Sequence, residues 1–152
     1  MTLETLKRFL VWYVNSMYEE GDVDELFYRY ESPRSNCNDD QLAKMVKSYC
    51  VEVKREISKL ESYSKLPNID IKKACRIARS IKARSILLGA ENVRKSCMHV
   101  IDSCLAFDEE SLADVVVCLS FVFKRTKMRF ETFLETADKI AEEEKQLGEA
   151  QK

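Results

Sequence analysis

The chain has 152 residues, of which 45% are apolar and 34% are charged, and it contains only 3 glycines and 2 prolines. So few glycines and prolines cannot supply the many turns of a β-sandwich or barrel, and the apolar content is too high for a disordered chain. The length predicts a single domain over residues 1–152, and the composition predicts an all-α fold with few, long helices.

Positive and negative side chains balance over the whole chain but not along it. Lys and Arg number 25 and Asp and Glu number 26, so the net charge of −1 gives no overall attraction to nucleic acid or to a membrane surface. Residues 70–95 hold eight cations and two anions, whereas residues 131–152 hold seven anions and three cations. This distribution is typical of a protein that meets a partner of opposite charge, and solvated helix faces produce the same counts.

Neither a secretory signal nor a membrane span is predicted. The first ten residues carry charges at Glu4, Lys7 and Arg8, and no apolar run approaches the roughly 20 residues that cross a bilayer. The six cysteines include no Cys-x-x-Cys pair, and five of them, all but Cys37, fall on predicted apolar helix faces, where a thiol acts as a small hydrophobe. With one histidine in the chain we expect no zinc site, and we expect a reducing compartment.

Capping residues and the helical period predict six helices. The first runs from a cap at Thr2 to Gly21, and the second begins at Asp22, whose capping box is completed by Glu25. A loop with one proline follows at residues 32–37. The other four helices are expected from 38 or 39 to the break at Pro67 and Asn68, from a cap at Asp70 to Gly89, from about 91 to 106, and from Leu112 into the acidic C-terminal stretch.

The last helix carries an apolar seam whose positions are spaced alternately four and three residues apart. A mean step of 3.5 residues is typical of helices that cross at about 20°, as in four-helix bundles. We therefore predict an antiparallel bundle over about residues 39–147, with the two N-terminal helices packed against one end. The seam occupies positions 116, 119, 123, 126, 130, 133, 137, 140, 144 and 147.

Few residues are placed for catalysis, and we expect no enzyme activity, no cofactor and no metal. The one histidine, His99, lies away from the apolar side of its helix and has no carboxylate four residues before or after it to orient its ring. The three glycines fall at predicted helix ends, so none forms a phosphate-binding loop. The basic segment 70–95 contains no aromatic residue on which a base could stack, so nucleic acid is not expected as a partner, although phosphate contact alone stays open.

One side of the predicted helix 70–89 combines positive charge with small and apolar residues. At 100° per residue, Lys72, Arg76, Arg79, Ala83 and Ile86 gather beside the buried side. Ala83 leaves the backbone approachable, and Ile86 places an apolar side chain where solvent is expected. This combination favours a docking surface, and an ordinary cationic helix with one stray isoleucine fits the same residues.

The run from Arg79 to Ala90, RSIKARSILLGA, resembles the signature of plant histidine-containing phosphotransfer proteins, which reads HQLKGSSSSIGA. Lys82, Ser85, Gly89 and Ala90 occur at the same spacing as in the signature. Helix order, chain length and the long last helix extend the likeness over essentially the whole chain. The resemblance implies a helical bundle in which Ser85 and Gly89 are structural and the fourth helix carries the binding site.

At the first position of this signature the chain has Arg79 where the family has its phosphoryl-accepting histidine. Phosphotransfer needs a neutral imidazole nitrogen as nucleophile, whereas a guanidinium group stays protonated and only donates hydrogen bonds. His99 belongs to the next predicted helix and cannot replace the acceptor. The family's glycine is Ala83 here, and the first serine of its run is Arg84. The sequence therefore resembles a pseudo-phosphotransfer variant that lacks the acceptor histidine.

The resemblance implies a role in the two-component His-to-Asp phosphorelay, which in plants carries the cytokinin signal and whose carriers move between cytoplasm and nucleus. The partners it implies are receiver domains of hybrid histidine kinases and of response regulators. A receiver presents carboxylates around its phospho-accepting aspartate, so a cationic surface suits it. We hypothesise that the chain, as a monomer, binds receivers without passing phosphate and so competes with active carriers. The residues expected to bind the receiver are Arg76, Arg79, Lys82, Ala83 and Ile86.

Two other interpretations stay open. The changed serine run, with Arg84, Ile86 and Leu87, also fits a helical scaffold that has left the relay and binds another partner through its seam or its acidic end. A carrier with an unrecognised acceptor would be revealed by phosphate uptake from a phosphorylated receiver.

Overall fold

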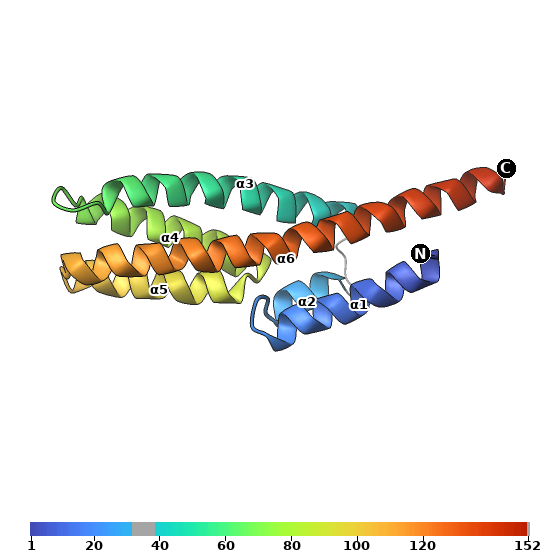
Figure 1. The fold of residues 1–152 in the computed structure, drawn as a ribbon, viewed down its shortest axis with the longest axis horizontal. Coiled ribbons are helices and arrows are strands. Elements are labelled where there is room, and N and C mark those ends of the chain that lie inside the picture. The colour runs from blue at the N-terminus through green and yellow to red at the C-terminus, as the bar shows by residue number, and fades with distance from the viewer. Residues whose placement is uncertain (32–38, 152) are drawn as a thin grey trace.

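A computed structural model describes residues 1–31 and 39–151. Over these residues the chain forms six helices and no strand, which confirms the predicted all-α fold (Figure 1). Within these ranges no helix is both long and apolar enough to cross a membrane. The loop predicted at residues 32–37 lies outside the described residues. The helices are α1 (Leu3–Glu19), α2 (Glu25–Glu31), α3 (Asp39–Tyr63), α4 (Ile71–Leu88), α5 (Glu91–Leu105) and α6 (Glu109–Ala150).

Helices α3 to α6 form the antiparallel bundle, in which each helix packs against its neighbour along the chain and α6 closes the bundle against α3. α6 has 42 residues and extends well beyond the other three helices (Figure 1). α1 runs antiparallel along this second half of α6, and the short α2 lies beside α1. The two N-terminal helices therefore lie at one end of the bundle, and α6 supplies most of the surface that holds them.

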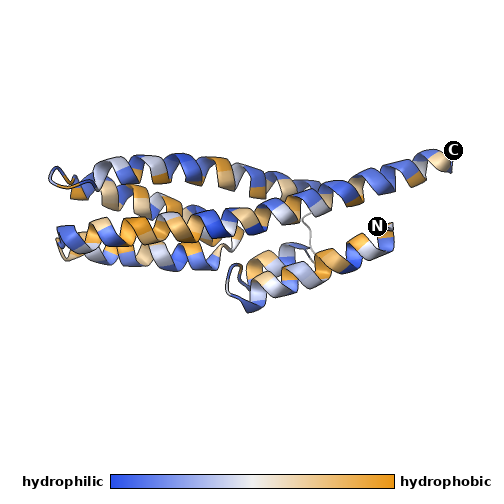
Figure 2. Ribbon diagram, viewed as in Figure 1, coloured by the Kyte–Doolittle hydropathy of each residue, from blue (hydrophilic) through white to orange (hydrophobic). Residues whose placement is uncertain are grey.

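The buried apolar side chains form one continuous core to which all six helices contribute. Figure 2 shows the apolar residues concentrated where the bundle helices face one another, whereas the C-terminal end of α6 is mostly hydrophilic. Phe27 of α2 packs against Phe130 and Phe133 of α6, with ring centroids 5.5 Å apart in both pairs. Aromatic pairs of this kind add about 1 kcal/mol each beyond the burial of area, so α2 is firmly joined to this core.

Acidic and hydroxyl side chains cap α1, α4 and α6 by accepting hydrogen bonds from free backbone amides. Thr2 Oγ1 and Asp70 Oδ1, the predicted caps of α1 and α4, each accept from the amide three residues later, at 3.2 and 3.1 Å. Asp108 caps α6 in the same way at 3.0 Å. Because of this cap, α6 begins at Glu109 and not at the predicted Leu112.

The predicted capping box of Asp22 and Glu25 is wrong, because Asp24 caps α2 instead. Asp24 Oδ1 accepts hydrogen bonds from the backbone amides of Leu26 and Phe27 at 2.9 and 3.3 Å. Both aspartates precede the helix and both satisfy the local preference for an acidic cap. The residues that pack around the two aspartates decide which of them caps α2.

Asp22 is a fully buried carboxylate that joins three segments of the chain. Its Oδ1 accepts a hydrogen bond from Asn92 of α5 at 3.1 Å and lies 3.5 Å from Arg125 Nε, while its Oδ2 lies 3.3 Å from Arg129 Nε. Both arginines belong to α6, and the Arg129 guanidinium also lies over the Tyr13 ring of α1, 4.8 Å from its centroid. A buried charge is costly unless it is paired, so the two arginines are what allow Asp22 to be inside.

The seam of α6 is buried at intervals from Leu112 to Ile140, which confirms the predicted period over that length. Thr136 is buried and the predicted Ala137 is only half-buried. From Phe130 onward α6 packs against α1 and α2. The last two predicted seam positions are exposed and lie beyond the apolar core: Glu144 and Leu147.

The five described cysteines are all free thiols, and three of them lie in the core. Burial raises the pKa of the Cys97 thiol to about 12 and the pKa values of the Cys50 and Cys104 thiols to about 11. Cys75 is half-buried. Cys118 is exposed on the outer side of α6, so the apolar environment predicted for it is wrong.

Gly89 ends α4 in the left-handed conformation, with a φ of 89°. Its carbonyl accepts a hydrogen bond from Asp24 N at 2.8 Å, which joins the end of α4 to the start of α2. A Cβ at this position would overlap Asp24 Oδ1 and would lie 2.9 Å from Phe27 N. Both the backbone conformation and the available space therefore require glycine.

Replacing Gly89 with alanine is expected to lower the free energy of unfolding by at least about 2 kcal/mol, because the new side chain strains the left-handed turn and displaces the Asp24 cap. Urea denaturation followed by circular dichroism measures the change. Gly148→Ala, where a Cβ meets open space, is the matched control and should not destabilise the chain. Equal stability of Gly89→Ala and wild type would contradict the packing described above.

At pH 8, iodoacetamide should modify Cys118 at least about 100-fold faster than Cys97, because a buried thiol stays protonated and cannot be reached. Timed alkylation followed by mass spectrometry of the two peptides gives both rates. Unfolding in urea should remove the difference. Similar rates in the folded protein would show that the Cys97 thiol is accessible.

Candidate partner-binding face of α4

The five residues predicted to contact a partner lie along one side of α4. Arg76, Arg79 and Ala83 are exposed, 46% of the surface of Ile86 is exposed, and Lys82 is half-buried. Spacings of three and four residues place them on successive turns of the same side. All five are therefore at least partly accessible to another molecule.

Leu87 extends this surface, although the sequence did not mark it as a contact residue. It is 70% exposed, beside Ile86, and its backbone carbonyl accepts a hydrogen bond from the Tyr30 hydroxyl of α2 at 3.2 Å. The signal for it was its position four residues after Ala83, since such residues share a helix side. We define the α4 face as Arg76, Arg79, Lys82, Ala83, Ile86 and Leu87.

The positive charges of the α4 face are not neutralised within the molecule. Among the described residues, no carboxylate lies within 4.0 Å of the charged nitrogens of Arg76, Arg79 or Lys82. Arg94, by contrast, is held by Glu91 at 2.6 Å. Cations without internal partners leave a positive potential on the surface, which attracts an anionic ligand.

Arg84 also lies on α4, but it serves the contact with α3. Its Nε donates a hydrogen bond to Glu56 Oε1 at 2.7 Å, and Ser80 Oγ donates to the same oxygen at 3.1 Å. A second carboxylate of α3, Glu52, lies 3.8 Å from the Arg84 guanidinium. Glu56 is almost completely buried, so Arg84 compensates a charge inside the helix pair.

Ser85 lies on the opposite side of α4 from the exposed residues and is fully buried. Its Oγ donates to the Ile81 carbonyl at 2.8 Å and lies 2.8 Å from the Tyr49 hydroxyl of α3. Because the single Ser85 proton is used on Ile81, Tyr49 is the donor of the second bond. Burial raises the pKa of Tyr49 far above its usual value, which keeps the phenol protonated as this bond requires. Ser85 thus fixes the rotation of α4 against α3.

A shallow hollow of about 370 Å³ adjoins the α4 face where α4 meets α3. Its walls include Met45 and Tyr49 of α3 and Arg84, Leu87 and Leu88 of α4. The hollow continues the apolar end of the α4 face sideways, so a partner on Leu87 also reaches α3.

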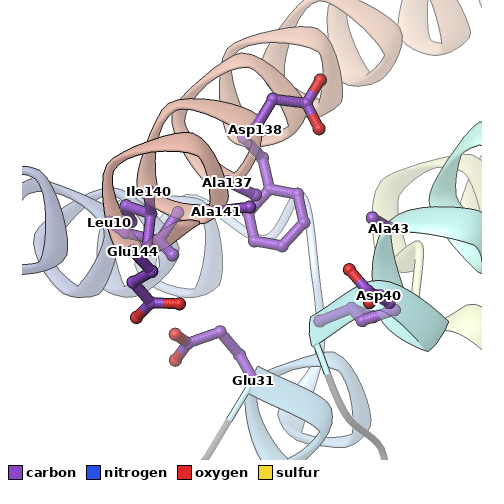
Figure 3. A pocket seen from close by; sticks show the side chains of 11 residues that line it. Leu10, Glu31, Asp40, Ala43, Ala137, Asp138, Ile140, Ala141 and Glu144 are labelled. Atoms are coloured by element: carbon purple, nitrogen blue, oxygen red, sulfur yellow. The ribbon is translucent and has the colours of Figure 1, made fainter. Parts of the chain in front are cut away.

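A second hollow of about 410 Å³ opens between α1, α2, α3 and α6 (Figure 3). Leu10, Phe133 and Ile140 contribute apolar walls. No residue of the α4 face lines it, and it is separate from the predicted site. Its edge carries the carboxylates that Figure 3 labels: Glu31, Asp40, Asp138 and Glu144.

The α4 face presents charged nitrogens and apolar groups in place of a nucleophile. The imidazole of His99 is exposed, as predicted, and belongs to α5. In residues 1–31 and 39–151, no three His, Cys, Asp or Glu side chains gather where a metal ion could bind. Guanidinium and ammonium groups bind anions through charge and hydrogen bonds, so this surface is suited to holding a ligand and not to attacking one.

Truncating Arg84 to alanine is expected to lower the free energy of unfolding by about 1–3 kcal/mol, because the buried Glu56 carboxylate loses its cation. Urea denaturation of Arg84→Ala, Glu56→Gln and the double variant forms a double-mutant cycle. The double variant should lose less than the sum of the two single losses. Additive losses would mean that the two side chains do not interact.

The comparisons with curated proteins and with solved structures find the same kind of protein. No family model matches the sequence. Among curated proteins, the chain is similar to Histidine-containing phosphotransfer protein 1 of Oryza sativa subsp. japonica. The two are 20% identical over 127 residues, which cover 84% of this chain and 86% of the rice protein.

Solved structures of three plant histidine-containing phosphotransfer proteins share this fold. A rice protein superposes with a TM-score of 0.83 and 20% identity, over 91% of this chain and 98% of its own. ZmHP2 from maize gives 0.79 and 24%, over 89% and 99%, and MtHPt2 from Medicago truncatula gives 0.82 and 16%, over 90% and 92%. The common fold and the sequence similarity together support homology between this chain and the plant histidine-containing phosphotransfer proteins.

Proposed function

We propose that this chain is a pseudo-phosphotransfer protein, which binds receiver domains of a two-component phosphorelay without carrying phosphate. Similarity to histidine-containing phosphotransfer proteins supports a role in such a relay. The observation that carries the finer proposal is Arg79, exposed on the α4 face at the position where the family motif has its acceptor histidine.

Arg79 stands at the acceptor position of the motif and is exposed, but its guanidinium group has a different chemistry from that of an imidazole. An acceptor must offer a lone pair to phosphorus, and the lone pairs of a guanidinium group are delocalised while its N–H groups point outward as donors. Arg79 can therefore hold the oxygens of an aspartate or a phosphorylated aspartate through paired hydrogen bonds. It does not take the phosphoryl group away.

The remaining residues of the α4 face suit the same partner. Arg76 and Lys82 add positive charge that complements the carboxylates around a receiver's phospho-accepting aspartate. Ala83 allows close approach to the helix backbone, and Ile86 and Leu87 offer apolar contact area at the end of the face. Charge sets orientation and the rate of encounter, and apolar contact supplies affinity.

The consequence for the relay is competition. A receiver that is bound to this chain cannot bind an active carrier at the same time. The rate of phosphate transfer through the relay therefore falls as the concentration of this chain rises. In a plant cell we expect this effect in cytokinin signalling, in the cytoplasm and the nucleus, where active carriers meet receivers. The chain acts through binding alone, with no catalytic residue and no cofactor.

Arg79→Glu is expected to weaken binding to a receiver domain at least tenfold, which is about 1.4 kcal/mol, because attraction to the carboxylates becomes repulsion. Isothermal titration calorimetry against the receiver of a hybrid histidine kinase measures the affinity. Lys139→Glu makes the same change in net charge on the exposed side of α6 and should leave the affinity unchanged. Equal affinities of Arg79→Glu and wild type would remove Arg79 from the interface.

Arg79→His tests the missing acceptor in the same experiment. With a radiolabelled phosphorylated receiver, this variant should take up label and the wild type should not. Label on the wild-type chain would overturn the proposal in favour of a carrier with another acceptor. Absence of binding to receivers from kinases and from response regulators would overturn it in favour of a scaffold outside the relay.

A further inference from the structure

The outward side of α6 carries a second seam, about half a turn from the buried one. Its positions are again spaced alternately four and three residues apart, and all are exposed. Val117, Phe121 and Met128 expose 54%, 67% and 68% of their surfaces. Three apolar side chains exposed on one side of a helix offer a contact surface to another helix. This outer seam comprises Glu110, Asp114, Val117, Phe121, Lys124 and Met128.

An open hollow lies beside the apolar centre of the outer seam. It has a volume of about 510 Å³, lies between α6 and the end of α3, and is lined by Val117, Phe121, Lys124 and Leu66 among others. Leu66 is 55% exposed, so both walls of the hollow present apolar groups to solvent. Apolar groups exposed on both walls mark a surface that gains stability when another apolar side chain covers it.

Between Asp114 and Lys124 the order of the charges makes the outer seam complementary to a second copy of itself. When two α6 helices lie antiparallel about a two-fold axis at position 119, Asp114 of each copy faces Lys124 of the other. In the same register Val117 of each copy faces Phe121 of the other, next to the hollow. Neither Asp114 nor Lys124 has an ion-pair partner within the part of the chain that the structure describes, and Lys124 Nζ lies 5.7 Å from the Phe121 ring centroid.

We infer that the outer seam of α6 is the interface of a homodimer with antiparallel α6 helices. The arrangement is isologous, so each unlike pair of residues occurs twice, as a two-fold axis requires. This inference replaces the monomer expected from the sequence, and it stands independently of the proposed function. The occupant of the seam is a second copy of this chain because that copy supplies both the opposite charges and the apolar side chains in one register.

The dimer leaves both α4 faces free. α4 packs against α3 and α5, and α6 packs against the other sides of the same two helices, so α4 and α6 lie diagonally across the bundle. Pairing through α6 therefore presents two α4 faces on opposite sides of one particle. Two binding faces on one particle raise the apparent affinity for a partner that is itself dimeric.

Sedimentation equilibrium of the full chain over a hundredfold range of concentration tests the inference. The mass is expected to rise with concentration from 17.7 kDa towards twice that value. Phe121→Glu should raise the dissociation constant at least about thirtyfold, because it places a charge at the centre of the interface. Trp12→Glu is the matched control, since Trp12 is 62% exposed on α1 and outside the outer seam, and it should leave the dimer intact. Circular dichroism verifies that each variant is folded.

A charge exchange separates this register from unspecific association. Asp114→Lys and Lys124→Asp should each weaken the dimer, since like charges then meet twice across the axis. The double variant should regain most of the lost affinity. A chain that keeps the monomer mass at every concentration would overturn the inference, and so would a double variant no tighter than the single ones.

Discussion

The structure depends on one constraint: the bundle and the N-terminal helix pair both bury apolar side chains against the same uninterrupted helix, α6. The first half of α6 completes the bundle with α3 and α5, and its second half receives α1 and α2. A helix is stabilised mainly by burial of its apolar side, so the long seam keeps α6 helical over both layers. The continuity of α6 in turn fixes the N-terminal helices relative to the bundle. Without that seam, neither α1 nor α2 would have a surface on which to bury Met17 and Phe27.

A polar junction defines how these two layers meet. Asp22 is buried between Asn92 of α5 and the two arginines of α6, where apolar contact alone would allow several arrangements. Removing one partner from such a group leaves a buried charge without compensation, which makes other arrangements costly. Close by, the Asp24 amide donates to Gly89, so the start of α2 is tied to the end of α4. The N-terminal helices are thereby connected to the helix that carries the α4 face.

The α4 face consists of side chains of α4 that stay at least partly exposed when α4 packs in the bundle. Ser85 forms a buried hydrogen bond with Tyr49, and Arg84 forms an ion pair with Glu56. Through these two polar contacts α3 orients α4. Arg76, Arg79 and Lys82 have no ion-pair partner in the described chain and are at least partly exposed. Ile86 and Leu87 continue the same surface with apolar area. A surface that is positive at one end and apolar at the other is suited to a folded partner with an acidic centre.

Much of this protein is determined by the sequence itself. Period and caps predicted the helices, since an amphipathic period reflects burial and a cap reflects local hydrogen bonding, and both are written in neighbouring residues. The residues of the α4 face, except Leu87, followed from the same period together with the motif. The motif residue Arg79 cannot itself accept a phosphoryl group, because the chemistry of a guanidinium group does not depend on where it lies.

Tertiary structure decided the matters in which two residues satisfy the same local rule. Asp22 and Asp24 are both acceptable caps. Asp22 is buried instead because Arg125 and Arg129 of α6 pair with its carboxylate. Arg84 and Arg79 are both unpaired in an isolated helix, and only the proximity of Glu56 engages the Arg84 guanidinium in an ion pair. Such choices depend on charges and surfaces contributed by residues distant in the chain, and these meet only when the helices pack.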